Sequence, residues 1–308
     1  MPISILVSGA TGFVGSAVLA GGAARGMTAG ALVRRHDGEY ELAGLQKGLR
    51  GVDCIVHCAG RAHVMTDASP DPLAAFRTSN VTGTLSLARA AAATGVRRFV
   101  FVSSIKVNGE STASGVPFLP SDPPRPADPY GMSKHEAEQA LRQLSAETGL
   151  EVVVIRPVLV YGPGVKANFL AMMRWLKRKV PLPFGLIDNR RSLVGLDNLV
   201  DLILTTVEHP KAAGQTFLVS DDEDVSTPEL LIRTAAALGT SARLIPVSPA
   251  LLCGVASLVG KRAALSRLCG SLQVDLRHTK MTLGWSPPNS VDAELDRTAR
   301  HFLCLEAN

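Results

Sequence analysis

The chain begins with the stretch that decides its fold, Ile3-Ser4-Ile5-Leu6-Val7-Ser8-Gly9-Ala10-Thr11-Gly12-Phe13-Val14-Gly15. Its apolar residues 3–7 predict a short buried strand, and a helical pattern follows the glycines as far as Arg25. Glycines at these points allow a tight turn, close packing of helix on strand, and approach of the backbone to a pyrophosphate at the helix N-terminus. A glycine triplet alone also fits a purely structural turn, but its place between a strand and a helix favours dinucleotide binding.

Apolar runs of strand length alternate with helical patterns through the first half of the chain. We expect strands at 28–33, 53–60, 98–102 and 152–155, and helices at 72–94 and 130–145. This alternation predicts an α/β fold with a doubly wound parallel sheet, which is Rossmann-like. The carboxyl ends of parallel strands meet at one edge, so Ser103 and Ser104 are expected there, near the glycine turn.

Tyr130 and Lys134 stand four residues apart in Asp128-Pro129-Tyr130-Gly131-Met132-Ser133-Lys134. On a helix this spacing places both on one face, where the ammonium is expected to lower the pKa of the phenol. An isolated pair of this kind also fits a solvated helix surface. The glycine turn and the Ser103-Ser104 strand end favour a catalytic pair instead.

Composition limits the classes of partner. The chain has 308 residues with 32 Lys+Arg and 27 Asp+Glu, and its mild net charge of +5 is poor evidence for a nucleic-acid partner. Five cysteines without a Cys-x-x-Cys pair are expected to stay reduced in the cytoplasm. The apolar segment 249–268 is interrupted by Lys261, Arg262 and Arg267, so we expect no membrane span but a buried or interfacial helix, with weak membrane-surface contact left open.

Several single residues bear on the ligands. Arg34 and Arg35 follow strand 28–33, where an arginine can accommodate a 2′-phosphate, so they favour NADP, although solvated arginines and dual cofactor use remain alternatives.

His57 lies within an apolar run and is interpreted as a core residue, as is Trp285. His278 and His301 have no partners at the spacing of metal ligands, so no metal site is expected.

Taken together, these motifs resemble the extended short-chain dehydrogenase/reductase family, the group of NAD-dependent nucleotide-sugar epimerases, dehydratases and reductases. The resemblance covers most of the chain and depends on order and spacing more than on any one motif. The matching motifs are Gly9-x-x-Gly12-x-x-Gly15, His57-x-Ala59, Asn80-Val81-x-Gly83-Thr84, Ser103-Ser104, Tyr130-x-x-x-Lys134, Arg156-Pro157, Tyr161-Gly162-Pro163 and Leu283-Gly284-Trp285-x-Pro287.

The resemblance implies roles for individual residues. Ser104 would orient the C4 oxygen of a sugar, Tyr130 would give or take the proton, and Lys134 would bind the nicotinamide ribose. The residues implied at an NAD(P)(H) cofactor are Gly9, Thr11, Gly12, Phe13, Val14, Gly15, Arg34, Arg35, Ala59, Asn80, Ser103, Tyr130, Lys134 and Pro157. Those implied at a UDP-sugar substrate are Ser104, Lys106, Tyr130, Lys166, Asn168, Pro183, Phe184 and Arg191, with Arg190 as the alternative to Arg191.

Two departures from the usual epimerase pattern guide the expected activity. Ile105-Lys106-Val107-Asn108 precedes Gly109, where epimerases often have a tyrosine just before the glycine, and Leu159 stands where many relatives have asparagine. The first expectation is therefore reduction of UDP-2-acetamido-2,6-dideoxy-4-hexulose to UDP-N-acetylquinovosamine for O-antigen (lipopolysaccharide) synthesis. The alternative is a UDP-glucose or UDP-N-acetylglucosamine 4-epimerase with tightly bound NAD. A dehydratase and a non-catalytic dinucleotide-binding protein are disfavoured.

The C-terminal half is expected to hold the substrate. Prolines become frequent after residue 155, which predicts a dinucleotide-binding domain at 1–157, completed by about 190–221, and a substrate-binding region at 158–189 and 222–308. A helix at 197–208, a strand at 215–219 and a helix starting near 226–229 are expected there. The resemblance also implies a homodimer formed through the helices at 80–94 and 130–145.

Overall fold

The computed structural model describes residues 2–32, 48–62, 71–113, 115–258 and 268–307. Within these residues six parallel strands form one sheet in the order β2-β1-β3-β4-β5-β8. The strands are β1 (Ser4–Ser8), β2 (Thr28–Leu32), β3 (Cys54–His57), β4 (Arg98–Val102), β5 (Glu151–Pro157) and β8 (Thr216–Val219). The predicted doubly wound, Rossmann-like sheet is confirmed. Because β1 lies between β2 and β3, the strand order reverses beside β1, and such a point is where open α/β sheets bind ligands.

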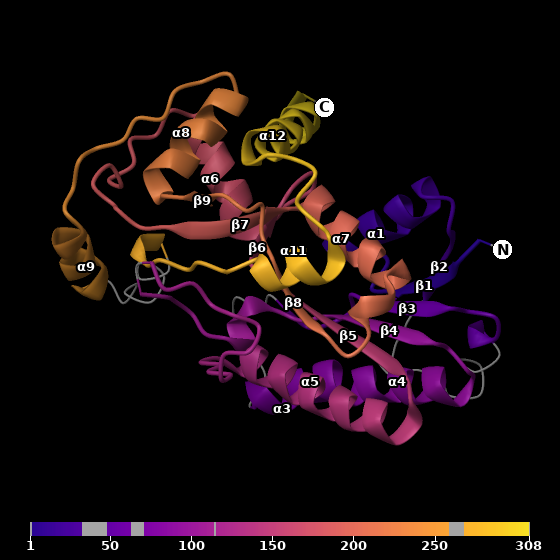
Figure 1. The fold of residues 1–308 in the computed structure, drawn as a ribbon. Coiled ribbons are helices and arrows are strands. Elements are labelled where there is room, and N and C mark those ends of the chain that lie inside the picture. Colours follow the sequence, from indigo (N-terminus) through magenta and orange to yellow (C-terminus); the bar gives the residue numbers. More distant parts are fainter. Residues whose placement is uncertain (1, 33–47, 63–70, 114, 259–267, 308) are drawn as a thin grey trace.

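Helices cover both faces of this sheet (Figure 1). One face carries α1 (Phe13–Ala24) and α7 (Leu196–Glu208), and the other carries α3 (Pro72–Arg77), the π-helical turn η1 (Thr78–Thr82), α4 (Gly83–Ala93) and α5 (Pro129–Thr148). Side chains along β5 alternate between two buried cores: Val153 and Ile155 face the first, and Val152 and Val154 the second. Successive side chains of a strand point to opposite faces of the sheet, and both faces are buried here. These strands are therefore apolar throughout.

A smaller group of elements has a core of its own. Its sheet has the order β6-β7-β9, with β6 (Leu159–Tyr161), β7 (Arg191–Gly195) and β9 (Asp224–Val225). Buried side chains of these strands pack with α6 (Ala167–Lys177), α8 (Thr227–Ala237) and α12 (Val291–Ala307). The remaining elements are η2 (Ile105–Val107), η3 (Pro210–Ala212), α9 (Pro249–Leu258) and α11 (Arg277–Leu283). The expected division into two domains stays a prediction, as does the homodimer.

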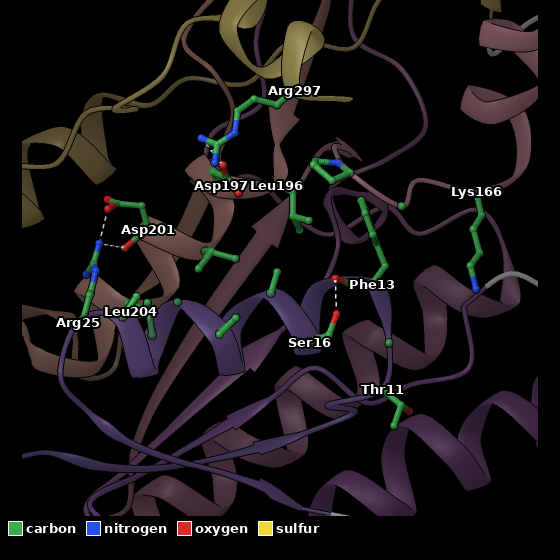
Figure 2. A pocket seen from close by; sticks show the side chains of 18 residues that line it. Thr11, Phe13, Ser16, Arg25, Lys166, Leu196, Asp197, Asp201, Leu204 and Arg297 are labelled. Carbon is green, nitrogen blue, oxygen red and sulfur yellow. Dashed lines mark hydrogen bonds and ion pairs between the residues drawn. The ribbon is translucent and has the colours of Figure 1, made fainter. Parts of the chain in front are cut away.

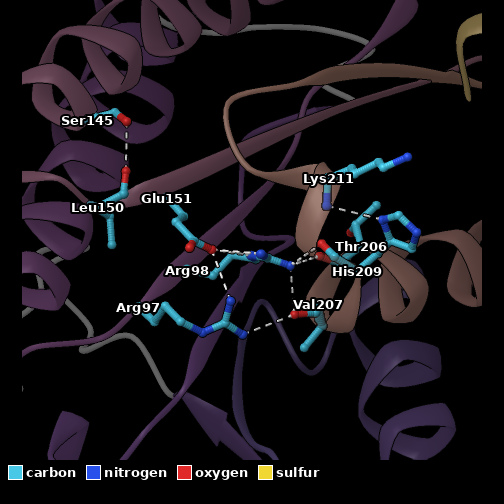
Figure 3. Close-up of polar contacts among 9 residues, drawn as sticks. All are labelled: Arg97, Arg98, Ser145, Leu150, Glu151, Thr206, Val207, His209 and Lys211. Carbon is cyan, nitrogen blue, oxygen red and sulfur yellow. Dashed lines mark hydrogen bonds and ion pairs between the residues drawn. The ribbon is translucent and has the colours of Figure 1, made fainter. Parts of the chain in front are cut away.

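A buried arginine fixes the end of α7 to the sheet (Figure 3). Arg98 in β4 is fully buried, and its Nη1 donates to the carbonyl oxygens of Thr206 (2.6 Å), Val207 (2.9 Å) and His209 (2.9 Å). The same guanidinium pairs with Glu151 at 2.7 Å. A cation at a helix C-terminus satisfies carbonyls that have no partner within the helix and opposes the negative end of its dipole.

Most expected elements are found at or within two residues of their predicted positions, but the strand expected at 53–60 ends at His57 and the helix expected at 130–145 extends to Thr148. Two other expectations differ from the structure in kind. The predicted helix 72–94 is divided by η1, because Asn80 turns inward there to bond with the backbone of Arg61 and with Ser133. For the segment 249–268, expected to be a buried or interfacial helix, the first alternative is wrong at the start of α9, because Pro249, Ala250 and Leu251 are exposed. No helix among the described residues is long and apolar enough to cross a membrane.

Candidate active site

The glycine turn brings the ends of β1 and β3 into contact. Gly9 has a φ of +71°, and a Cβ built on it would lie 2.7 Å from the backbone nitrogen of Ala59. A Cβ on Gly15 would lie 2.1 Å from the carbonyl oxygen of Gly9. Both positions therefore require glycine, the first for its backbone angle and the second for the close packing of α1 on the turn. The turn lies at the point where the strand order reverses.

This turn fits the pyrophosphate of a dinucleotide. Helix α1 starts after Gly12 with no side-chain cap and no acidic residue in its first turn, so its positive end is not neutralised locally. A ligand that brings its own negative charge can bond to these N–H groups. Thr11, Phe13 and Val14 belong to the same turn and helix start, and Pro157 is buried at the end of β5.

Tyr130 is positioned by the start of α5. The side chain of Asp128 caps this helix by accepting from the N–H of Gly131 at 2.7 Å, and Pro129 occupies the first turn. The carbonyl of Tyr130 accepts from Ser133 Oγ at 2.8 Å, and its ring lies 6.1 Å from that of Phe76. The sequence motif thus carries its own helix-start signals, which hold the tyrosine at the carboxyl edge of the sheet.

Lys134 lies one helical turn further along α5 and is buried. Its Nζ donates to the carbonyl of Val102, the last residue of β4, at 2.8 Å and lies 4.5 Å from the ring centroid of Phe101. Burial lowers the pKa of Lys134 to about 8, although the neighbouring Cys58 and Glu138 act in the opposite direction. The ammonium is thus fixed at the same strand end that carries the two serines.

The predicted lowering of the pKa of Tyr130 by Lys134 is wrong for this arrangement. Burial raises the pKa of the phenol to about 12, the hydrogen bond with Ser104 lowers it, and the charge of Asp128 raises it further. The physical reason is that desolvation disfavours the phenolate, while the ammonium is directed at the carbonyl of Val102. At neutral pH the phenol is therefore protonated.

The two serines at the end of β4 have different surroundings. Ser104 bonds to the phenol of Tyr130, and its hydroxyl also accepts from the N–H of Lys106 at 3.3 Å, which caps η2. Ser103 is buried and donates to Glu138 Oε1 at 2.6 Å. The hydroxyl of Ser103 is thus engaged below the site, and its backbone N–H donates to the carbonyl of Ile155 at 2.7 Å, so the contact expected with a cofactor would fall to its carbonyl.

Below the site lies a buried network that the sequence analysis missed. Arg156 Nη2 pairs with Glu138 Oε2 at 2.6 Å, its Nε donates to Oε1 at 2.9 Å, and its Nη1 donates to Asn108 Oδ1 at 2.9 Å. Glu138 and Arg156 are buried, as is Ser103, which bonds to the same carboxylate. The signal available in the sequence was Glu138 four residues after Lys134, on the same face of the helix.

Asn80 fixes the loop that follows β3. Its Oδ1 accepts from the N–H of Arg61 at 2.8 Å, and its Nδ2 donates to the carbonyl of Arg61 at 3.1 Å and to Ser133 Oγ at 2.9 Å. A Cβ on Gly60 would lie 3.2 Å from Asn80 Oδ1 and 3.4 Å from Lys134 Nζ. Asn80 therefore connects the loop at 60–61 with the catalytic helix, whatever contact it makes with a cofactor.

The basic residues expected at the substrate differ in their availability. Lys106 forms ion pairs with Asp128 and with Glu110, the latter at 3.1 Å. Arg191 is half-buried and donates to the carbonyl of Gly270 at 2.9 Å, whereas Arg190 is exposed and pairs with Glu229 at 3.2 Å. Arg191 is therefore the inward arginine of the two.

The remaining substrate candidates lie on α6 and on the proline-rich loop. Lys166 precedes α6 and is exposed, as is Asn168 in its first turn. Pro183 and Phe184 are half-buried in a loop whose backbone bonds to residues 243–245: Leu182 donates to Arg243 at 2.8 Å. Phe184 also packs against the smaller core. The structure places these residues on the side of the molecule that carries Arg191 and α8.

Other predictions concern single residues. Arg34 and Arg35 lie outside the described residues, so the preference for NADP stays a prediction. The core interpretation of His57 is confirmed: its Nδ1 lies 2.6 Å from Ser8 Oγ and its Nε2 2.9 Å from Thr84 Oγ1. Trp285 is buried, as predicted. No group of three potential metal ligands occurs among the described residues.

A groove of about 760 Å³ runs between α1 and α7 (Figure 2). It reaches Thr11, Gly12 and Phe13 at the glycine turn and approaches Lys166, but neither Ser104 nor Tyr130 lines it. Arg25 and Asp201, which form an ion pair, line its other end. The groove therefore adjoins the expected cofactor turn and is separate from the residues that would perform chemistry.

Comparison with known proteins agrees with this arrangement. Residues 5–220 match the model of the NAD dependent epimerase/dehydratase family. A UDP-glucose 4-epimerase of Vibrio cholerae is 46% identical over 98% of this chain and 96% of its own length. A GDP-6-deoxy-D-mannose reductase of Pseudomonas aeruginosa is 27% identical over 79% of this chain and 78% of its own. MoeE5, solved in complex with UDP-glucose and NAD, has the same fold, with a TM-score of 0.76 at 21% identity, and the match covers 99% of this chain and 100% of that one.

Proposed function

The chain belongs to the NAD dependent epimerase/dehydratase family, and from that membership we propose that it is a UDP-sugar 4-epimerase that uses Ser104, Tyr130 and Lys134. The observation that carries the proposal is the site itself: the phenol of Tyr130 bonds to Ser104, and Lys134 is fixed beside them at the end of β4. The Vibrio cholerae relative supports C4 epimerisation over the reduction that the sequence favoured first.

The cofactor of the family fits the residues present. The uncapped start of α1 and the glycine turn would hold the pyrophosphate of NAD(P), and Lys134 would hold the nicotinamide ribose. When bound, the oxidised nicotinamide supplies the hydride acceptor and a positive charge beside the phenol. The sequence of Arg34 and Arg35 favours NADP, and measured affinities for NAD and NADP would test that preference directly.

Proton transfer falls to Tyr130. Abstraction of the proton from a C4 hydroxyl requires the phenolate, which the hydrogen bond from Ser104 stabilises. Return of the proton to the C4 oxygen requires the phenol, the form that burial favours. Ser104 bonds to the phenol and lies where it can also bond to the C4 oxygen, so it would keep donor and acceptor aligned through both steps.

Reduction of a 4-keto-6-deoxy sugar is the second candidate, with UDP-2-acetamido-2,6-dideoxy-4-hexulose as substrate and UDP-N-acetylquinovosamine as product. Two observations favour it. The raised pKa of Tyr130 suits a proton donor to a ketone. Leu159, which begins β6 directly after Pro157 and Val158, is 49% exposed, and its apolar side chain would suit a C6 methyl group better than a hydroxymethyl group.

The test compares the two activities in one purified preparation. With UDP-glucose or UDP-N-acetylglucosamine we expect the C4 epimer to form at constant mass, with no net change in nicotinamide absorbance. Stoichiometric loss of NADH or NADPH with the 4-keto-6-deoxy sugar, and no epimerisation, would instead establish the reductase. In either case Tyr130→Phe should retain cofactor binding while turnover falls by roughly two to four orders of magnitude. A Phe variant of undiminished activity would remove Tyr130 from the mechanism.

A further inference from the structure

Helix α9 and the strand-like segment before it expose apolar side chains on the side of the molecule that carries the substrate candidates. Residues 244–260 contain no charged side chain. Leu251 in α9 is 60% exposed and Ile245 is 47% exposed, and Pro249, Ala250, Cys253 and Gly254 are exposed as well. An apolar helix that stays exposed to water lacks the hydrophobic stabilisation that burial against a partner would give it. This surface, Arg243, Ile245 and residues 249–254, is named the α9 surface below.

The charge of the surrounding sequence is one-sided. Between Glu229 and Asp275 the chain has no acidic residue but contains Arg233, Arg243, Lys261, Arg262 and Arg267, so this stretch alone accounts for the net charge of +5. Arg233 is neutralised by Glu223 at 2.6 Å and by Asp292 at 3.6 Å. Lys261, Arg262 and Arg267 are known here from sequence only, because they lie outside the described residues. The partner that complements this stretch is therefore apolar and anionic.

The α9 surface lies at the edge of the molecule, away from the six-stranded sheet (Figure 1). It is nevertheless connected to the substrate side by backbone bonds. Gly185 donates to the carbonyl of Ile245 at 3.0 Å, which ties the proline-rich loop to the surface. Further along the chain, the carbonyl of Gly270 accepts from Arg191 at 2.9 Å. A partner bound at α9 would thus lie near the expected substrate residues.

We propose that the α9 surface binds peripherally to a membrane surface that contains anionic phospholipid. Helix α9 has ten residues, about 15 Å of helix, which is half of the roughly 30 Å of a bilayer's hydrocarbon core, so it lies in the interface and does not span. Apolar residues flanked by basic ones are the composition of interfacial helices. A second copy of this chain is the poorer occupant, because its stretch between Glu229 and Asp275 has the same basic sequence and no acidic residue to complement it.

Vesicle flotation of the full chain tests this proposal. The protein should float with vesicles of phosphatidylcholine containing phosphatidylglycerol and stay behind with phosphatidylcholine alone, and added salt should weaken the binding. Leu251→Asp should weaken binding roughly tenfold or more, since it places a carboxylate among acyl chains. Ile232→Asp is the matched control, because Ile232 is 53% exposed on α8, outside the surface, and should bind as the unaltered protein does.

A charge reversal provides a second, independent arm. Arg243→Glu should weaken binding to the anionic vesicles several-fold, whereas Arg300→Glu, at an exposed position on α12, should leave it unchanged. The proposal is overturned if the protein does not float, if it floats equally with neutral vesicles, or if Ile232→Asp and Leu251→Asp weaken binding alike. It is also overturned if Leu251→Asp converts a dimer to a monomer in sedimentation velocity, since a second copy would then be the occupant.

Discussion

At the residue scale, Tyr130 and Lys134 lie one helical turn apart on α5, yet their titrating groups have different surroundings. The phenol bonds to Ser104 and has a pKa raised to about 12, whereas the ammonium bonds to Val102 and has a pKa lowered to about 8. Desolvation is the first cause of both shifts, because it disfavours the charged form of either group. At a given pH, the neutral fraction of each side chain is therefore larger than its ordinary pKa would give.

The lowered pKa of Lys134 predicts a pH dependence. The ammonium is present below about pH 8 and is lost above it, so kcat/KM should fall as the pH rises through that value. Lys134→Arg should be slower at neutral pH but lack this fall, because a guanidinium keeps its charge. Steady-state rates across the pH range, with cofactor binding as the control, would check it. A variant with the same alkaline fall as the unaltered protein would contradict the assignment.

Gly15 permits a prediction about the glycine turn. Gly15→Ala would place a Cβ 2.1 Å from the carbonyl oxygen of Gly9, so the turn must open, at a cost in stability of about 1–3 kcal/mol. Because this turn would hold the pyrophosphate, cofactor affinity should fall as well. Gly48→Ala is the matched control, since a Cβ there meets no atom of the described residues within 4 Å. Urea unfolding and cofactor titration measure both effects, and equal behaviour of the two variants would refute the account.

At the element scale, α5 is held to the sheet by charge as well as by apolar packing. Leu141 and Ala137 of α5 belong to a fully buried core, and beside them Glu138 pairs with Arg156 of β5. Burial raises the pKa of Glu138, whereas the charge of Arg156 and the hydrogen bonds from Arg156 and Ser103 lower it. The net result is a pKa below the ordinary value. The pair thus remains ionised and sets the position of the catalytic helix.

Removal of one partner of this pair should be costly. Arg156→Met leaves the carboxylate of Glu138 buried, with only the partly exposed Arg142 as a charged partner, and should destabilise the fold by about 3–5 kcal/mol. Arg142→Ala removes the other charged partner of this carboxylate. Because the Arg142 side chain is 47% exposed, this change should cost only about 0–1 kcal/mol. Urea unfolding of the two variants makes the comparison. Similar small losses for both would show that the buried pair does not anchor α5.

At the scale of the whole molecule, a group of carboxylates lies between α7 and the C-terminal helix α12. Glu294 is fully buried, and a Cβ on Gly195 would lie 2.3 Å from its side chain. Burial, with the charges of Asp197 and Asp221, raises the pKa of Glu294 to about 7, whereas Arg297 lowers it. Glu294 Oε1 accepts from Asn289 at 2.9 Å, and Oε2 has no hydrogen-bond partner among the described residues.

This arrangement predicts that stability falls with rising pH. A carboxyl whose pKa is higher in the folded than in the unfolded state stabilises the fold below about pH 4.5, and this contribution is lost as the pH rises through 7. Glu294→Gln should therefore raise the free energy of unfolding at pH 8 by about 2 kcal/mol and flatten its pH dependence. The exposed Glu147→Gln is the control. Thermal unfolding across this pH range measures both, and an unchanged slope for Glu294→Gln would count against the assignment.

Local patterns predicted the strand ends, the glycine turn and the Tyr130–Lys134 pair, because each depends on residues close in sequence. Contacts between distant residues were not predictable in this way. Nothing in the spacing of Arg190 and Arg191 shows which of them turns toward Gly270. Likewise, the pKa of Tyr130 depends on how deeply the phenol is buried, which only the packed fold determines. Nor does local spacing show that Asn108, a departure from the epimerase pattern, is a partner of the buried Arg156.

The most direct measurement of the central claim follows the hydrogen at C4 of the sugar. UDP-glucose and UDP-N-acetylglucosamine, each deuterated at C4, are incubated with the purified protein, and the products are analysed by mass spectrometry and NMR. We expect at least one of them to give its galacto epimer with deuterium still at C4, and Tyr130→Phe to abolish this conversion. If neither sugar is epimerised, or if the label is lost to solvent, the proposed exchange of hydride at C4 beside Tyr130 is contradicted.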